Sequence, residues 1–149
     1  MTLRAALLAL WEAPQNLLGA ALYAAERAVG FAEGADRENG RLFIKSQVSA
    51  VSLGYFVFWT EGTTRYFVHD ASTRLHEYGH TFQSRLLGPL YLPLVGVPSV
   101  LRVLYALLYR EATGRRWGGY FDGYPERWAD RLGGVTRNYR DTLATVSDT

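Results

Sequence analysis

Cysteine is absent from this chain of 149 residues. Its absence excludes disulfide bonds, thiolate metal ligands and cysteine nucleophiles, so a metal site or a catalytic base must be built from histidine, aspartate, glutamate or tyrosine. Histidine is scarce as well, because His69, His76 and His80 are the only three. All three fall in one short segment, and chemistry that depends on imidazole is therefore confined to that segment.

A large excess of charge of either sign is also missing. Lysine and arginine number 16, and aspartate and glutamate 14, which gives a formal net charge of +2. This small imbalance indicates no nucleic-acid partner, because nucleic-acid-binding domains carry a clustered basic surface. Hydrophobic residues make up 48% of the chain, which fits one compact domain over residues 1–149. We expect residues 1–31 to form an amphipathic N-terminal helix, residues 41–134 the core and residues 135–149 a polar tail.

The N-terminal segment lacks the long uninterrupted apolar stretch of a secretory signal. Residues 5–11 are apolar and follow Arg4, but Glu12 and Pro14 interrupt them, and we expect no signal peptide. Beyond Pro14 the apolar residues recur at helical spacing. This spacing predicts an amphipathic helix whose apolar stripe contains Leu17, Leu18, Ala21, Leu22 and Ala25.

A second apolar run carries no charge over residues 86–101 and extends to residue 109 if Arg102 is disregarded. A membrane-spanning helix needs roughly 20 predominantly apolar residues, and three prolines in this run favour a turn, an irregular segment and then a helix over residues 98–112. Two interpretations stay open, namely burial in a small core and binding to a membrane surface. The second would use the N-terminal helix and residues 86–109, and the expected location is cytoplasmic or peripheral to a membrane.

The remaining segments predict a small sheet and two helices. Residues 33–40 are polar and indicate a solvated loop. Residues rich in β-branched and aromatic side chains predict strands over 41–48, 52–60 and 65–68, with a hairpin turn at 61–64. One helix should begin at Asp70 or Ser72 and end at Gly88 and Pro89, and a shorter one should begin at Pro125 and end at Gly133 and Gly134.

His76, Glu77 and His80 form an H-E-x-x-H pattern inside the longer predicted helix. Histidines four residues apart project from the same face of a helix, so their imidazole nitrogens can converge on one tetrahedral Zn²⁺ ion. Zinc lowers the pKa of a bound water toward about 7, and a nearby carboxylate can take the proton and pass it to a leaving amine. The pattern thus predicts Glu77 as the general base and acid.

Two histidines are too few for a catalytic zinc site, which has three protein ligands and an open position. Glu126 and Asp130 are four residues apart on the shorter predicted helix, so one can bind the metal while the other accepts the free N–H of a ligating histidine. His69 is expected to be a strand-end or cleft residue, since a third histidine ligand would leave Glu126 without a role. Gly79 and Ala129 are small, which favours a close crossing of the two helices.

The pattern H-E-x-x-H followed by E-x-x-A-D resembles the gluzincin clan of zinc metallopeptidases. The resemblance implies that His76, His80 and Glu126 bind zinc, that Glu77 is the general base and acid, and that Asp130 supports a ligand histidine. Residues 76–84 and 128–134 also resemble small, uncharacterised bacterial zincin-like proteins, and the match spans about residues 49–134. In gluzincins the strand before the active-site helix lies at the sheet edge and pairs with extended substrate. Residues 52–60 or 65–68 could fill that role here.

We therefore expect a small single-domain α+β fold of zincin-like type, with a short twisted antiparallel or mixed sheet and one zinc ion between the two helices. The expected reaction is hydrolysis of a peptide bond in a peptide or protein substrate. The alternative is a non-catalytic, metal-stabilised domain that binds a membrane surface or a protein partner. The sequence indicates no substrate-binding residues, and none of Tyr120, Tyr124 and Tyr139 stands out as the group that stabilises an oxyanion. The arginines at 115, 116, 137 and 140 are expected on a solvated surface.

Overall fold

The computed structural model describes residues 3–137. Its first two elements are helices. They are α1 (Leu3–Trp11) and α2 (Ala13–Val29), so the single helix expected over residues 1–31 is wrong. The helical conformation is interrupted at Glu12. The carboxylate of Glu12 accepts two hydrogen bonds from the buried guanidinium of Arg41, at 2.7 and 3.0 Å. This paired interaction draws Glu12 into the interior and fixes the junction of the two helices.

A four-stranded mixed sheet follows, with the strand order β1-β2-β4-β3. Its strands are β1 (Ala32–Glu38), β2 (Arg41–Ser46), β3 (Val51–Leu53) and β4 (Phe56–Trp59). β2 and β4 are parallel, and the other two pairs are antiparallel. The predicted strand over residues 41–48 is confirmed, whereas the loop expected over residues 33–40 is wrong. Most of that segment is the edge strand β1, which pairs through its backbone and leaves its charged side chains in solvent.

Two turns differ from the predictions. Residues 52–60 are not one strand, because β3 and β4 are joined at Gly54, whose φ of +64° suits glycine. The hairpin turn expected at residues 61–64 is displaced: β5 (Gly62–Thr63) pairs with β6 (Val68–His69), and the intervening residues form the turn. A hydrogen bond from the Thr64 amide to the Phe67 carbonyl, 2.8 Å long, closes it.

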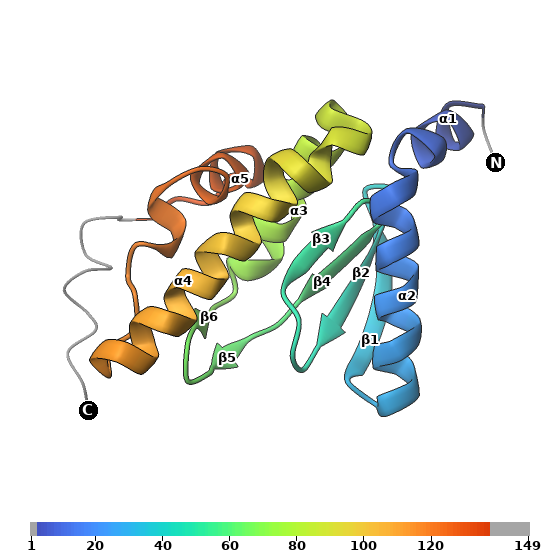
Figure 1. The fold of residues 1–149 in the computed structure, drawn as a ribbon. Helices are drawn as coiled ribbons and strands as arrows, with labels where there is room; N and C mark the ends of the chain where they lie inside the picture. The colour runs from blue at the N-terminus through green and yellow to red at the C-terminus, as the bar shows by residue number, and fades with distance from the viewer. Residues whose placement is uncertain (1–2, 138–149) are drawn as a thin grey trace.

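Helices cover both faces of the four-stranded sheet (Figure 1). On one face Phe56 packs against α2, where Gly19 leaves the room and the Tyr23 ring lies 6.2 Å away. On the other face Phe43 packs against Tyr78, with ring centroids 5.9 Å apart. Tyr78 belongs to α3 (Thr73–Leu87), so the sheet carries α3 on the face opposite α2.

The predicted bounds of the H-E-x-x-H helix are confirmed by α3. Its capping differs from the expectation, because neither side chain caps the first turn. The Asp70 carboxylate instead accepts hydrogen bonds from the Ser72 amide at 2.8 Å and from the Ser72 hydroxyl at 2.5 Å. At the other end Gly88 has a φ of +53° and ends the helix before Pro89.

The proline-containing run forms two short helical turns followed by a long helix. They are η1 (Gly88–Leu90), η2 (Leu92–Gly96), which is a π-helical turn, and α4 (Val97–Thr113). The helix expected over residues 98–112 is thus confirmed, whereas the turn and irregular segment expected before it are wrong, because residues 88–96 form 3-10 and π-helical turns that lead directly into α4. Within the described chain, one helical stretch, Leu92–Thr113, is long and apolar enough to cross a bilayer, and 11% of its most apolar window is buried.

The last elements are η3 (Tyr120–Asp122) and α5 (Glu126–Gly133), which packs against α3. A Cβ atom at Gly79 would lie 1.9 Å from the Ala129 carbonyl oxygen, and one at Gly133 would lie 2.1 Å from the Leu75 carbonyl oxygen. Any larger residue at either glycine would force the helices apart. The predicted close crossing at Gly79 and Ala129 is therefore confirmed.

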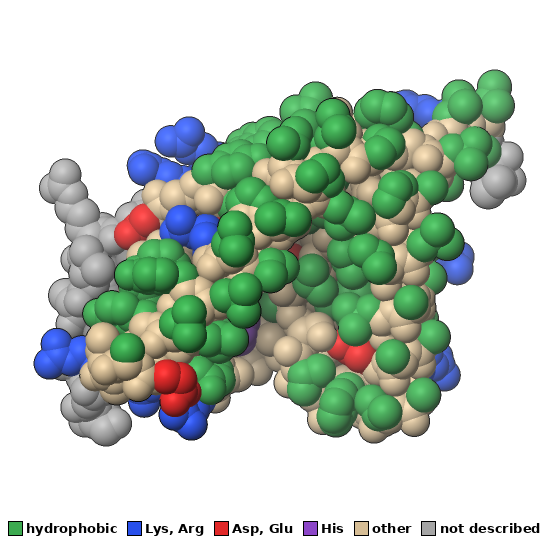
Figure 2. All heavy atoms as spheres, viewed as in Figure 1, with side chains coloured by type: hydrophobic (Ala, Val, Ile, Leu, Met, Phe, Trp, Pro, Cys, Tyr) green, Lys and Arg blue, Asp and Glu red, His purple; other side chains and the backbone are tan. Residues whose placement is uncertain are grey.

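The exterior of this fold is unusually apolar on one side, which we call the apolar face. Figure 2 shows hydrophobic side chains along α1, α2 and α4 on this side of the molecule. Its most exposed members include Leu3, Leu7, Leu10, Leu17, Leu18, Leu94, Val97, Val100, Leu101, Leu104 and Leu108. By contrast the interior holds many buried polar groups, among them Glu12, Gln15 and Arg41. Helix α2 therefore turns Gln15 and Glu26 inward and Leu17 and Leu18 outward, whereas α1 has no buried residue.

Candidate metal centre

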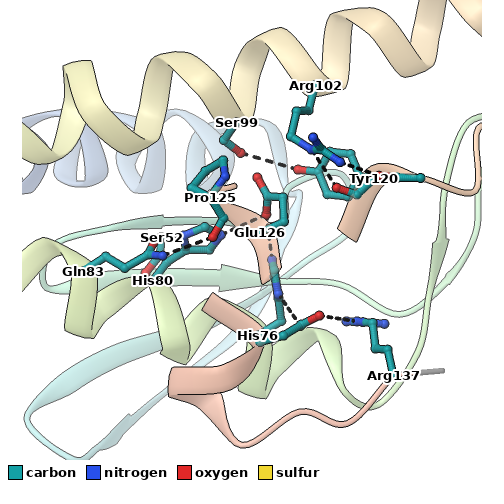
Figure 3. A network of polar contacts seen from close by, with 12 residues as sticks. Ser52, His76, His80, Gln83, Ser99, Arg102, Tyr120, Pro125, Glu126 and Arg137 are labelled. Carbon is teal, nitrogen blue, oxygen red and sulfur yellow. Dashed lines mark hydrogen bonds and ion pairs between the residues drawn. The ribbon is translucent and has the colours of Figure 1, made fainter. Parts of the chain in front are cut away.

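Helices α3 and α5 bring His76, His80 and Glu126 together at their crossing. Their ligand atoms all lie within 4.8 Å of one another, and all three residues are buried. The Nε2 atoms of His76 and His80 lie 3.0 and 3.1 Å from the same oxygen, Oε2 of Glu126. Figure 3 shows the three side chains pointing toward one another. The structure thus assembles the three residues that the sequence predicted as metal ligands.

The orientation of each histidine ring is fixed by a hydrogen bond at Nδ1, the ring nitrogen that faces away from the centre. The Nδ1 atom of His76 lies 2.7 Å from Oδ1 of Asp130, and that of His80 lies 2.7 Å from Oε1 of Gln83. Gln83 donates its amide N–H to the Pro125 carbonyl at 3.1 Å, so its oxygen must face His80. Each Nδ1 atom therefore carries the hydrogen and donates it, which leaves the Nε2 lone pairs directed at the centre.

This donor set requires a positive charge between its members. The ionised carboxylate oxygen lies about 3 Å from each Nε2 atom and repels both lone pairs unless a proton or a metal ion lies between them. Ligands of a tetrahedral zinc ion, with bonds of about 2.0–2.1 Å, lie about 3.3 Å apart, which is close to the two N–O separations of 3.0 and 3.1 Å in this centre. Oε1 of Glu126 has no hydrogen-bond partner within residues 3–137. Two imidazoles and one carboxylate without a thiolate suit Zn²⁺.

The ionisation of the centre agrees with this requirement. Burial lowers the pKa of His76, but hydrogen bonds to Asp130 and Glu126 outweigh burial and raise this pKa to about 9. Burial also opposes ionisation of Glu126, yet hydrogen bonds from His76 and His80 hold the pKa of this carboxyl well below its usual range. In the absence of metal, Glu126 is therefore ionised and His76 is protonated at neutral pH.

Asp130 is itself held by a residue that the sequence did not indicate. The Nε atom of Arg137 donates to Oδ2 of Asp130 at 3.0 Å, and the guanidinium lies 3.8 Å from the centre of the Phe121 ring. The solvated surface expected for the arginines at 137 and 140 is thus wrong for Arg137, while residue 140 lies outside the described residues. Gly134, with a φ of +73°, ends α5 and lets the chain return toward Asp130.

Glu77 lies beside the three ligands and borders open space. Its Oε2 atom is buried and has no hydrogen-bond partner in the described part of the chain. Burial raises the pKa of this carboxyl, and the neighbouring His80 and His76 oppose the rise. A carboxyl with a raised pKa can both accept and return a proton near neutral pH, as a general base and acid must.

Two cavities meet at Glu77 and share the lining residues Ala50, Glu77 and Tyr120. The smaller cavity, about 190 Å³, is also lined by His69 and His76. His69 is therefore a cleft residue, as predicted, and it does not belong to the group of described residues that could hold a metal ion. The larger cavity, about 430 Å³, extends between α2 and α4. Figure 2 shows the hollow between these helices, with a histidine visible beneath α4.

Tyr120 is the tyrosine that lines both cavities beside the centre. Arg102 donates hydrogen bonds to the carbonyl oxygens of Tyr120, at 2.7 Å, and Gly119, which fixes the loop that carries this side chain. Burial raises the pKa of Tyr120 well above its usual value, and the Glu126 carboxylate adds to the rise. Its hydroxyl therefore stays a donor. The Tyr124 hydroxyl instead donates to the Leu94 carbonyl, at 2.5 Å, and residue 139 lies outside the described residues.

The sheet edge that lies beside the centre is partly covered. β3 lies at the edge of the sheet and its residues line the larger cavity. However, the Tyr91 hydroxyl donates to the Ser52 carbonyl at 2.9 Å, so the central carbonyl of β3 is already occupied. The residues of β6 line the smaller cavity. Pairing of an extended substrate with residues 52–60 or 65–68 remains a prediction, and a substrate on β3 would have little free edge.

Comparisons with known proteins gave no match, whether the chain was compared with protein-family models, with curated proteins or with solved structures. The functional conclusion therefore depends on the geometry of the metal centre and of the cavities beside it.

Proposed function

We propose that this protein is a zinc-dependent metallopeptidase. One zinc ion would be held by His76, His80 and Glu126, with Asp130 positioning His76 and Glu77 acting on the reacting water. The observation that carries the proposal is the convergence of two imidazole nitrogens and one carboxylate beside a buried glutamate at the meeting point of two cavities. A structural zinc site is closed by four protein ligands, whereas three ligands and adjoining space are typical of a catalytic site.

The reaction follows from the groups around this point. Bound zinc supplies a Lewis acid that polarises a carbonyl and lowers the pKa of water. Glu77 accepts the proton of the attacking water and delivers it to the leaving nitrogen of the scissile bond. The Tyr120 hydroxyl, which remains protonated, is placed to donate a hydrogen bond to the carbonyl oxygen as negative charge develops there. The substrates would be peptides or proteins.

The apolar face supports a location at a membrane surface. Arg102 is the one charged residue between 86 and 109, and its guanidinium is turned inward onto Tyr120 and Gly119. Glu12 is likewise buried in its pair with Arg41. The outer sides of α1, α2 and α4 therefore present leucine and valine, and the one exposed acidic residue of these helices, Glu111, lies in the last turn of α4 in an ion pair with Arg65. This arrangement suits insertion into the interface of a bilayer.

One observation favours a second candidate function. The ligands are almost fully buried and the edge of β3 is partly covered by Tyr91, which suits a non-catalytic domain that uses the metal for stability and the apolar face for binding. The two functions differ in whether Glu77 is needed for a reaction.

The deciding experiment compares the wild-type protein with a Glu77→Gln variant and with Glu61→Gln, an exposed glutamate, as the control. Zinc content is measured by elemental analysis, and cleavage is measured on a diverse peptide library. We expect all three proteins to bind one zinc ion and only Glu77→Gln to lose turnover, by about 100-fold or more. A zinc-loaded wild-type protein that cleaves no peptide would support the non-catalytic function.

A further inference from the structure

The larger cavity connects the metal centre to the apolar face. Its inner end is lined by Glu77 and His80. Its outer wall includes Leu18 of α2 and three residues of α4, and these four side chains are 51–59% exposed: Leu18, Val97, Val100 and Leu101. The same residues are thus members of the apolar face and of the cavity wall. A ligand that lies on the apolar face can reach Glu77 without crossing a polar surface.

The lining of this cavity suits aliphatic side chains. Leucine, valine, alanine and glycine dominate the walls, and the polar groups gather near the centre. Gly96 contributes backbone only, and a Cβ atom there would meet a single neighbour, the Leu92 side chain, at an ordinary contact distance of 3.6 Å. The cavity thus has spare room on the side of η2.

The two cavities together favour a linear polymer over an acyl chain. They share the lining residues Ala50, Glu77 and Tyr120, so a ligand that extends past Glu77 from the aliphatic cavity would meet the residues of the smaller one. The smaller cavity is lined by His69, Thr73 and aromatic rings, which offer polar and aromatic contacts. A polypeptide can place an aliphatic residue on one side of its scissile bond and a different residue on the other, whereas an acyl chain is aliphatic along its whole length.

We propose that the larger cavity selects an aliphatic side chain next to the scissile bond of a polypeptide segment bound at a membrane surface. This inference rests on the proposed function, because it takes the metal centre as the place of hydrolysis. It adds the substrate class: membrane-associated polypeptides with leucine-like residues, received through the opening between α2 and α4.

The test measures binding without turnover. Zinc-loaded Glu77→Gln protein in detergent micelles is titrated with short fluorescent peptides that have identical polar ends and a central leucine, alanine or aspartate. We expect the leucine peptide to bind about tenfold or more tighter than the aspartate peptide, because burial of one aliphatic side chain is worth that much. Leu101→Asn should weaken binding of the leucine peptide by about tenfold, and Gly96→Leu, which fills the cavity, should do the same.

Leu108→Asn is the matched control, since Leu108 is 70% exposed on α4, compared with 59% for Leu101, and is not among the residues that line the larger cavity. Equal binding by the Leu101→Asn and Leu108→Asn proteins, equal binding of the leucine and aspartate peptides, or no binding of either would overturn the inference. Displacement of the peptide by a lysolipid without any preference among the peptides would assign the cavity to an acyl chain instead. If the preference holds and wild-type protein cleaves nothing, the peptidase proposal alone fails.

Discussion

At the scale of single residues, the candidate metal centre depends on hydrogen bonds made on the far sides of its two histidine rings. Asp130 accepts the Nδ1 hydrogen of His76 with one oxygen and a hydrogen bond from Arg137 with the other. Gln83 plays the corresponding part for His80 and is fixed in turn by the Pro125 carbonyl. These contacts select the ring tautomer that directs Nε2 at the centre, so they would control the affinity for a metal without touching the ion.

Asp130→Asn should lower zinc affinity by about 10- to 100-fold, a typical cost of losing the group that orients a ligand. If the asparagine keeps its oxygen on His76, its NH₂ group meets the Arg137 donor, and the pair loses its charge. Zinc affinity is measured by competition with a chelator. Asp36→Asn, which alters an exposed carboxylate paired with Arg74, is the control. An unchanged affinity in Asp130→Asn would contradict the role assigned to this contact.

Zinc affinity should also depend on pH in a stated direction. The pKa of His76 is raised to about 9 in the metal-free protein, so below that pH zinc must displace a proton from the site. Each unit of pH below about 9 should therefore weaken zinc binding by about tenfold, and the affinity should level off above it. Chelator competition between pH 6.5 and 9.5 measures the slope. A flat profile over this interval would show that His76 carries no displaced proton.

At the scale of helices and strands, sequence patterns predicted what depends on local spacing. The bounds of α3 followed from the glycine and proline at its end, and the shared face of His76 and His80 followed from their separation. The strand β1 was missed, because its pairing with β2 is made by backbone groups and its side chains are polar. Arg137 was missed for another reason. It follows Asp130 by seven positions, and the turn at Gly134 that brings the two residues together produces no periodic pattern.

The crossing of α3 and α5 should be sensitive to the smallest added group. In Gly79→Ala the new methyl group would overlap the Ala129 carbonyl, so α5 must move and carry Glu126 away from the histidines. We expect a loss of about 1–3 kcal/mol of unfolding free energy together with a loss of bound zinc. Urea unfolding and elemental analysis measure the two effects. Gly34→Ala, where an added methyl group meets nothing within 4 Å, is the control, and equal behaviour of both variants would contradict the close crossing.

At the scale of the whole molecule, the α+β fold places the candidate metal centre below the apolar face. Glu12, at the junction of α1 and α2, and Arg102 of α4 are turned inward, and leucines occupy the outer sides of these helices. The sequence left both burial and membrane binding open for residues 86–109, because periodicity shows that a helix has an apolar side without showing what covers it. The exposure of α4 supports the proposed location at a membrane surface.

The double variant Leu104→Lys/Leu108→Lys tests this placement of the whole molecule. It puts two charges on the exposed outer side of α4, where the wild-type residues are 48% and 70% exposed, so folding should be little affected. Each leucine transferred from water into lipid contributes about 1.5–3 kcal/mol at full burial, and binding to phosphatidylcholine vesicles should fall by more than tenfold. Flotation of the protein with vesicles measures the bound fraction. Leu75→Lys, at a half-exposed leucine of α3, should float like the wild-type protein, and equal flotation of the double variant would place α4 away from the bilayer.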